Sequence, residues 1–205
     1  MKLKIWELSL LVAVIVTILC GFILEGQQRE LSDKLIRIHV VANSDSDEDQ
    51  ALKLAVRDAI LEETGALLKG ISNIEAAREI IGENLTQLNA CAAREIEDEG
   101  FSYTVSAGLQ EESFPTREYE TFSLPAGRYM ALRVVIGEGD GKNWWCVMFP
   151  PLCLTDGVLA LSDESKETLK NNLTTEEYNL VTKSPSGAVP IEVRFKIVEI
   201  FQKIF

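Results

Sequence analysis

Few side chains in this sequence could carry out acid–base or nucleophilic chemistry. His39 is the only histidine, so a Ser-His-Asp or Cys-His mechanism would have to use it. It follows Arg37 on an alternating segment and precedes Asn43 and Ser44, which allows a site at the end of a strand. A single histidine on a strand is more commonly a structural group, because each ring nitrogen can hydrogen-bond to a neighbour. We therefore expect no catalytic residue and no enzyme.

The acidic run after this segment resembles the start of a calcium-binding loop. Asp45, Asp47 and Asp49 have the alternate spacing of such loops. However, Gln50 stands where the loop needs glycine, and Val56 stands where it needs the closing glutamate. Carboxylates before a helix also accept hydrogen bonds from its free N–H groups and complement its dipole. Helix capping is the favoured interpretation, and the sequence predicts no metal site and no cofactor.

A glycine-rich segment at residues 137–142 has some features of a phosphate-binding loop. It reads Gly-Glu-Gly-Asp-Gly-Lys and lacks the Gly-Lys-Ser/Thr ending of that loop. A strand pattern follows it, whereas a phosphate-binding loop leads into a helix. We expect a hairpin turn that joins two paired strands.

Two adjacent tryptophans are the strongest candidates for a binding surface. Trp144 and Trp145 lie on a predicted strand, so their rings should point to opposite faces. Arg117 lies in a loop that also carries an aromatic residue and a proline, and exposed Trp and Arg side chains commonly anchor protein interfaces. Filling of the core by one of the two rings is the alternative. The predicted partner-binding residues are His39, Asn43, Ser44, Asp45, Arg117, Trp144 and Trp145.

The cysteines leave the redox state of the chain open. Cys20 lies in the apolar N-terminal segment, which leaves Cys91, Cys146 and Cys153. Cys146 and Cys153 bracket a short loop and could form a disulfide if their Cα atoms lie within about 7 Å. Two buried, reduced thiols are the alternative, and the role of Cys91 stays open.

The N-terminus predicts a membrane segment. No charged residue occurs from Leu8 to Leu24, and a helix of that length spans roughly 26 Å, close to the ~30 Å hydrocarbon core of a bilayer. Lys2 and Lys4 precede the run, which favours export of the residues on its C-terminal side. No good pair of small residues marks a cleavage site, so we favour an anchor that is not cleaved, or one that is cleaved poorly. The predicted division is a membrane segment at 1–24, a linker at 25–33 and one domain at 34–205.

Hydrophobic periodicity indicates an α+β domain. The net charge of −12 argues against nucleic acid as a partner, because it repels the phosphate backbone. We expect a mostly antiparallel sheet packed by two main helices, since sequential strands joined by short turns pair antiparallel. The predicted strands lie at 34–42, 101–107, 119–124, 128–136 and 143–149. The polar run at residues 43–49 opens the first predicted helix, which ends near Gly65. A second predicted helix begins at Ser72 and extends to about Ala92. Short helices are predicted from Ser162 and at Thr174 with Glu177, and the C-terminus after residue 190 is predicted to be extended and then helical.

These segments also carry a family resemblance. Residues 35–50, LIRIHVVANSDSDEDQ, resemble the opening block of the stage II sporulation protein R family. Residues 114–117 (FPTR), residues 124–127 (LPAG) and the string GEGDGKNWWCVMFPPLC at 137–153 resemble its second block. The resemblance covers residues 35–153, and the long final string is its most specific part.

The resemblance implies a signalling role in endospore-forming bacteria. Such proteins are made in the forespore, exported into the space between the two membranes, and remain anchored or are secreted there. They activate a membrane-embedded aspartic protease of the mother cell, which then processes a sigma-factor precursor. The implied partners are that receptor protease and the membrane, the latter through residues 8–24, and oligomeric state is left open.

Two other functions fit the exported domain without the resemblance. One is an extracytoplasmic cell-wall hydrolase that uses His39 with the acids at Asp45–Asp49. The other is a wall-binding module that uses the tryptophan pair as a platform for stacking sugars. Loss of a hydrolytic activity in a His39→Ala variant, or retention on insoluble wall material, would identify them.

Overall fold

The computed structural model describes residues 4–119, 122–152 and 163–182, and the predictions for the C-terminus after residue 190 lie outside these residues. The chain is an α+β protein, as predicted. In chain order the elements are α1 (Ile5–Ser32), β1 (Ile36–Val41), α2 (Asp47–Leu67), α3 (Ile74–Glu83), α4 (Leu85–Asp98), β2 (Val105–Phe114), β3 (Arg117–Glu118), β4 (Ser123–Leu124), β5 (Gly127–Ile136), β6 (Asn143–Phe149), α5 (Asp163–Asn172) and α6 (Thr175–Thr182).

The main sheet is mixed rather than a run of sequential hairpins. Its strand order is β2-β5-β1-β6. β1 pairs parallel with β5 and antiparallel with β6, while β2 pairs antiparallel with β5. The apolar residues of β1, such as Ile38 and Val40, are fully buried, so the strand is most stable in the centre with a neighbour on each side.

The predicted hairpin at residues 137–142 is wrong for the same reason. β5 and β6 do not pair with each other, because β1 lies between them. The segment therefore crosses the end of β1, over two interstrand spacings or roughly 10 Å. The N–H of Asp140 donates to the carbonyl of Asn43, and the N–H of Gly141 donates to that of Ala42. Backbone hydrogen bonds thus bind the crossing loop to the end of the central strand.

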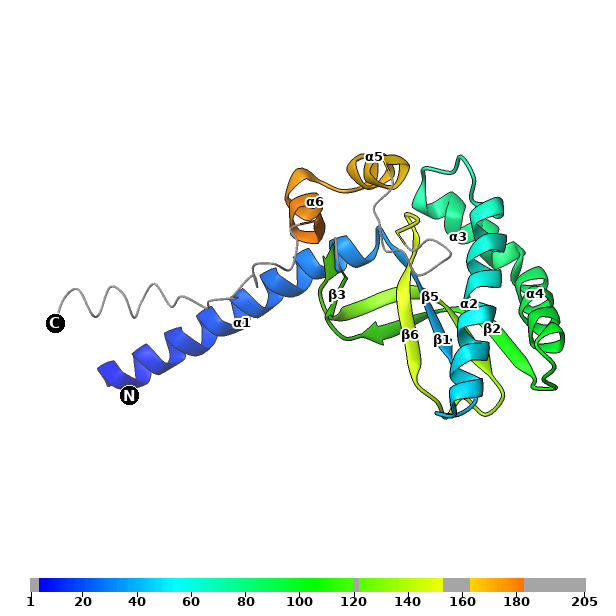
Figure 1. Ribbon diagram of the computed structural model, residues 1–205. Coiled ribbons are helices and arrows are strands. Elements are labelled where there is room, and N and C mark those ends of the chain that lie inside the picture. Colours follow the sequence, from blue (N-terminus) through cyan, green and yellow to red (C-terminus); the bar gives the residue numbers. More distant parts are fainter. Residues whose placement is uncertain (1–3, 120–121, 153–162, 183–205) are drawn as a thin grey trace.

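Three helices, rather than two, cover one face of this sheet (Figure 1). α2 is capped by Ser46, whose side chain accepts from the N–H of Asp49. The helix continues through Gly65 to Leu67, so the predicted stop at Gly65 is wrong by two residues. The core on this face includes Ile38 from β1, Val56 from α2 and fully buried residues of the other two helices.

The helix predicted from Ser72 is divided in two. α3 is capped by Asn73 rather than Ser72, because the Asn73 side chain accepts from the N–H groups of Glu75 and Ala76. Asn84 then separates α3 from α4. Its side chain donates to the carbonyl of Ile80, which competes with the next helical turn. The apolar spacing continues across this break, so periodicity alone could not reveal it.

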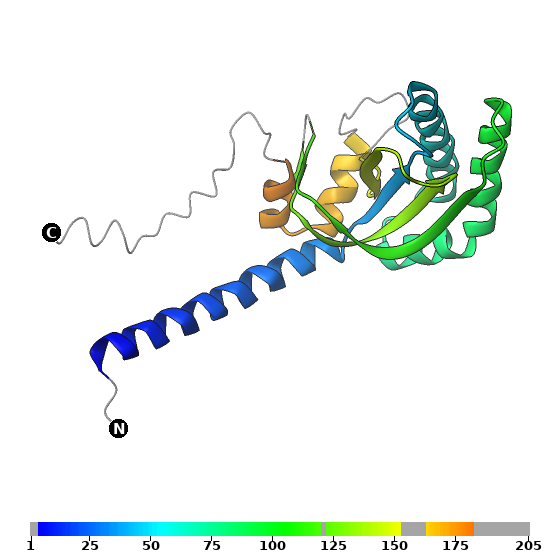
Figure 2. The same cartoon turned by 90° about the horizontal axis from the view of Figure 1, so that it is seen from below.

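A second core covers the opposite face of the sheet. It joins residues from the end of α1, the β3–β4 hairpin, the sheet and the two C-terminal helices. Residues 25–32, which we expected in a linker, continue α1, and Leu31 and Leu35 are each only 1% exposed. Figure 2 shows α1 leaving the rest of the molecule as one long helix, with only its last turns beside the other elements.

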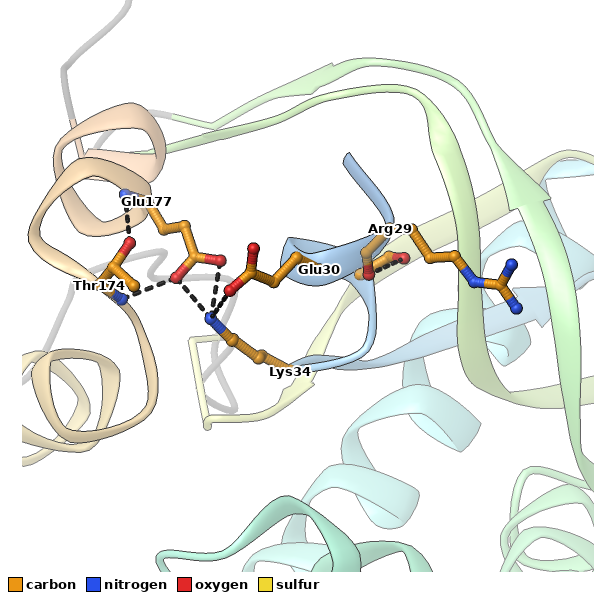
Figure 3. A network of polar contacts seen from close by, with 6 residues as sticks. Arg29, Glu30, Lys34, Thr174 and Glu177 are labelled. Carbon is orange, nitrogen blue, oxygen red and sulfur yellow. Dashed lines mark hydrogen bonds and ion pairs between the residues drawn. The ribbon is translucent and has the colours of Figure 1, made fainter. Parts of the chain in front are cut away.

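An ion-pair network fixes this end of α1 to the C-terminal helices (Figure 3). Lys34 Nζ lies 2.8 Å from each carboxylate oxygen of Glu177 and 3.3 Å from Glu30. Glu177 and Thr174 form a capping box at the start of α6, as the sequence predicts. A single carboxylate therefore caps α6 and binds it to the start of the domain.

The outer part of α1 carries exposed apolar side chains. Large hydrophobic residues from Trp6 to Ile18 are between 47% and 62% exposed. Within the described part of the chain, no helix combines the length and apolar character needed to cross a membrane.

Candidate partner-binding surface

His39 lies at the centre of a polar cluster on the sheet face that opposes α2, α3 and α4. The strand register places it beside Arg133 of β5 and Trp145 of β6. Its Nδ1 lies 2.8 Å from Glu112 Oε2, and its Nε2 lies 2.7 Å from Asn143 Oδ1. Both ring nitrogens are therefore occupied by neighbours on other strands.

Glu112 connects the histidine to the solvent-exposed edge of the cluster. Its other carboxylate oxygen lies 3.2 Å from Arg133 Nη1. The side chains of His39 and Glu112 are 13% and 12% exposed, whereas that of Arg133 is 42% exposed. The pair is thus mostly shielded from water, and the arginine presents its charge at the surface.

Arg117 and Trp145 form the outer layer of the same cluster. The guanidinium carbon of Arg117 lies 4.1 Å from the centre of the Trp145 ring, a favourable cation–π distance. Trp145 also stacks on His39, with ring centres 5.6 Å apart and an interplanar angle of 29°. Arg117 is exposed and Trp145 is half-buried. Arginine and tryptophan in such a layer are the residue types that anchor protein interfaces.

A buried arginine supports the cluster from below. Arg37 is fully buried, and its guanidinium lies over the ring of Phe114 at 4.0 Å and that of Tyr129 at 5.0 Å. It donates to the Tyr119 hydroxyl, which in turn donates to the carbonyl of Trp145. Burial lowers the pKa of Arg37 and raises the pKa of Tyr129 to about 12. The aromatic rings partly replace the water that the cation loses.

Trp144 lies on the opposite face of β6, as strand alternation predicts. Its ring packs beside the helical core, and the Arg57 guanidinium carbon lies 4.9 Å from the ring centre. It is therefore separated from Trp145 by the sheet. The structure does not bring the two predicted tryptophans into one surface.

Asn43, Ser44 and Asp45 form a separate cluster at the end of β1. Asn43 and Ser44 both donate to Asp49, and these bonds lower the Asp49 pKa even though burial opposes the shift. Asp45 accepts from the N–H of Lys142 in the crossing loop. These side chains hold α2 and the loop together. The predicted capping of the helix N–H groups by these carboxylates is wrong, because Ser46 is the cap, but Asp47 and Asp49 do lie in the first turn of α2, where they complement its dipole. Across the described ranges, no group of three or more His, Cys, Asp or Glu side chains could hold a metal ion.

The structure describes the state of two of the cysteines outside the apolar N-terminal segment. Cys146 is disulfide-bonded, whereas Cys153, its predicted partner, lies outside the described residues. Cys91 is a free thiol, half-buried on α4, and burial raises its pKa. A raised pKa keeps this thiol protonated and unreactive.

His39, Arg117 and Trp145 were predicted from the sequence, but the residues that contact His39 were not. Glu112, Asn143 and Arg133 come from three other strand positions, and no spacing in the sequence marks them as neighbours of His39. Alternation along β2 could have placed Glu112 on a face, but only the sheet order brings that face beside β1.

Comparison with known proteins agrees with these motifs. A model of the stage II sporulation protein R family matches residues 32–159. The chain belongs to this family. It is 42% identical to stage II sporulation protein R of Bacillus subtilis (strain 168) over 149 residues, which is 71% of this chain and 66% of that relative, slightly under two thirds of its length. No solved structure matches the chain. The family is one of sporulation proteins, and its name denotes no enzyme activity.

Proposed function

We propose that this chain is an exported sporulation signal that binds and activates a membrane-embedded aspartic protease of the mother cell. The signal is made in the forespore and acts in the space between the two membranes. The activated protease then processes a sigma-factor precursor. Membership of the stage II sporulation protein R family supports this role.

The N-terminal segment supports the proposed location. Residues 8–24 carry no charged side chain, and the apolar side chains between Leu10 and Ile18 are exposed along α1. A soluble protein rarely exposes so many neighbouring apolar side chains, which favours their burial in lipid or a translocation channel. We propose that this segment directs export and leaves the domain anchored or secreted.

The observation that carries the proposed activity is the layer formed by Arg117, Trp145 and His39. The arginine is exposed above the indole, and the indole is fixed by the histidine, which Glu112 and Asn143 hold in turn. A preorganised Arg–Trp layer loses little side-chain entropy when a partner binds. We place the receptor contact here, and we assign Asn43, Ser44, Asp45 and Trp144 to support of the fold.

The same geometry favours binding over the two alternatives. A wall hydrolase that pairs His39 with the acids at Asp45–Asp49 finds the histidine bound to Glu112 and Asn143 instead. A sugar-stacking platform needs an open indole face, but Arg117 lies over the ring of Trp145. Both alternatives therefore require this cluster to rearrange.

Replacing Arg117 tests the proposed surface. We expect Arg117→Ala to weaken receptor binding at least tenfold, on the order of the loss seen for arginine anchors at interfaces. The measurement is co-purification of full-length chain with the receptor protease from membranes, together with the rate of precursor processing. Arg94→Ala is the matched control, because Arg94 is also exposed but lies on α4.

Both variants should be exported and folded, and Arg117→Ala should lose no more than about 1 kcal/mol of the free energy of unfolding, because its side chain is exposed and loses one cation–π contact. Equal binding and processing by Arg117→Ala and Arg94→Ala would refute the surface. A strain without this protein that processes the precursor on schedule would refute the function itself.

A further inference from the structure

The backbone of the edge strand β2 has hydrogen-bond partners on its outer side in its first half. In its second half the outward backbone groups have no partner among the described residues. Within residues 4–119, 122–152 and 163–182, β2 pairs with β5 alone and forms an edge of the sheet. Asn89 of α4 closes the first half: its side chain accepts from the N–H of Ala107 at 2.7 Å and donates to the Ala107 carbonyl at 2.9 Å. An amide side chain thereby takes the place that a neighbouring strand would occupy.

The bonds to Asn89 show which backbone N–H and carbonyl groups of β2 point away from β5. Since both backbone groups of Ala107 point away from β5, the same groups of Leu109, Glu111 and Ser113 point the same way, by the two-residue period of a strand. Among the described residues, no hydrogen bond reaches the N–H or carbonyl of these three. Natural sheets usually block such an edge with a bulge, a proline or a covering element.

A cavity lies at the far end of this open edge. It has a volume of about 500 Å³, and its lining includes Glu111 and Ser113 of β2, Arg128 of β5, and Arg29 at the end of α1. Figure 3 shows the Arg29 side chain extending away from the Lys34 network, toward the strands. The open backbone groups therefore lead directly into a hollow that could take a side chain of an added strand.

We propose that the receptor protease contributes an extended segment that adds to β2 as a further strand at Leu109–Ser113. This rests on the function proposed above and names the structural element of the partner. Main-chain bonds to the outward groups of Leu109, Glu111 and Ser113 hold the segment, and one of its side chains enters the cavity. Strand addition to an exposed edge is a common mode of peptide recognition.

Charge argues against a second copy of this chain as the occupant. If two β2 edges paired antiparallel through all three open positions, the two Glu111 side chains would lie directly opposite each other. Like charges in that position destabilise a sheet, and each copy carries a net charge of −12. Glu111 pairs with Arg128 at 2.8 Å, but both side chains are more than half exposed, so a neutral or basic residue of the partner can replace this contact.

Proline at an outward position tests the proposal. Proline removes the N–H group that a partner strand would accept, but the N–H of Ser113 makes no bond within the sheet, so the fold should persist. We expect full-length Ser113→Pro to bind the receptor protease in membranes about fivefold to tenfold more weakly, as for one lost interface hydrogen bond. Ser113→Ala, which keeps the N–H, is the control and should bind within about twofold of the original chain.

Amide hydrogen exchange of the unaltered chain gives an answer that does not depend on the proline variant folding. In the free protein, the amides of Leu109, Glu111 and Ser113 should exchange faster than those of Gln110 and Glu112, which bond to β5. In the complex, the three fast amides should slow at least tenfold. A complex that forms without slowing them, or that binds Ser113→Pro and Ser113→Ala equally, would overturn the proposed strand addition and leave the receptor function intact.

Two other outcomes have different meanings. Failure of the unaltered chain to bind the receptor would overturn the proposed function, and the strand addition with it. Slowing of the same three amides by self-association alone, without the receptor, would overturn the choice of a receptor segment as the occupant.

Discussion

At the scale of single residues, the crossing loop lies in close contact with the end of β1. The N–H of Glu138 donates to the Asn43 side chain, and the N–H of Lys142 donates to that of Asp45. A Cβ at Gly141 would overlap the carbonyl oxygen of Ser44 and lie 2.6 Å from its carbonyl carbon. Only glycine fits at this position, because the loop lies directly against the backbone of Ser44 and leaves no room for a Cβ atom.

Gly141→Ala should destabilise the domain. The added methyl meets backbone atoms that cannot rotate away, so we expect a loss of about 1–3 kcal/mol in the free energy of unfolding. Gly108→Ala is the matched control: no atom lies within 4 Å of its Cβ position, and alanine in a strand should be neutral or slightly stabilising. Chemical unfolding of both variants measures the difference, and equal midpoints would contradict the close approach.

At the scale of elements, α6 is docked through one shared carboxylate. Burial alone would raise the Glu177 pKa, but the hydrogen bonds from Lys34 and Thr174 outweigh it and lower the pKa below the usual 4.5. The Lys34 pKa is raised for the reciprocal reason: burial lowers it, and the bonds to Glu177 and Glu30 more than offset that effect. Charge therefore contributes to the junction of α1, β1 and α6.

The stabilisation from Glu177 should depend on pH in a defined direction. Because its pKa in the folded protein lies below the unfolded value, the contribution is present above about pH 4.5 and is lost as the pH falls through the lowered pKa. Glu177→Gln should thus be less stable than the original chain at pH 7, and the gap should narrow below pH 4.5. Glu167→Gln, on the exposed side of α5, should show no gap, and a pH-independent gap would count against the ion pair.

The two ends of α1 belong to different environments. Leu31 is 1% exposed in the second core, whereas Leu10 on the same helix is 61% exposed. We expect Leu31→Ala to reduce the free energy of unfolding by about 2–5 kcal/mol, and Leu10→Ala to leave it unchanged. Unfolding of the full chain in mild detergent measures both. Equal effects would show that the last turns of α1 are not part of the folded domain.

At the scale of the whole molecule, two cores enclose one sheet, and they are built differently. The core beneath α2, α3 and α4 is formed by regular amphipathic helices. The other is assembled from a helix end, a short hairpin and two short helices, and it leaves Arg117 and the outward edge of β2 exposed. Both proposed contact surfaces thus lie outside the helical layer.

The sequence by itself determined the elements whose signals are local. The bounds of β6, the presence of α2 after the polar run and the capping box of α6 all follow from neighbouring residue types, since alternation and caps act over a few residues. The family also followed from the sequence, through uninterrupted strings of residues. The division at Asn84 was missed because the apolar spacing continues across it.

Only the tertiary structure decided which strands are neighbours. β1 enters between β5 and β6, and this single insertion turned an expected hairpin into a crossing loop. It also placed His39 beside Glu112, 73 positions away in the chain, and left β2 at an edge. Strand pairing depends on which whole faces of the strands become buried, and the residues next to a given position in the sequence do not determine it.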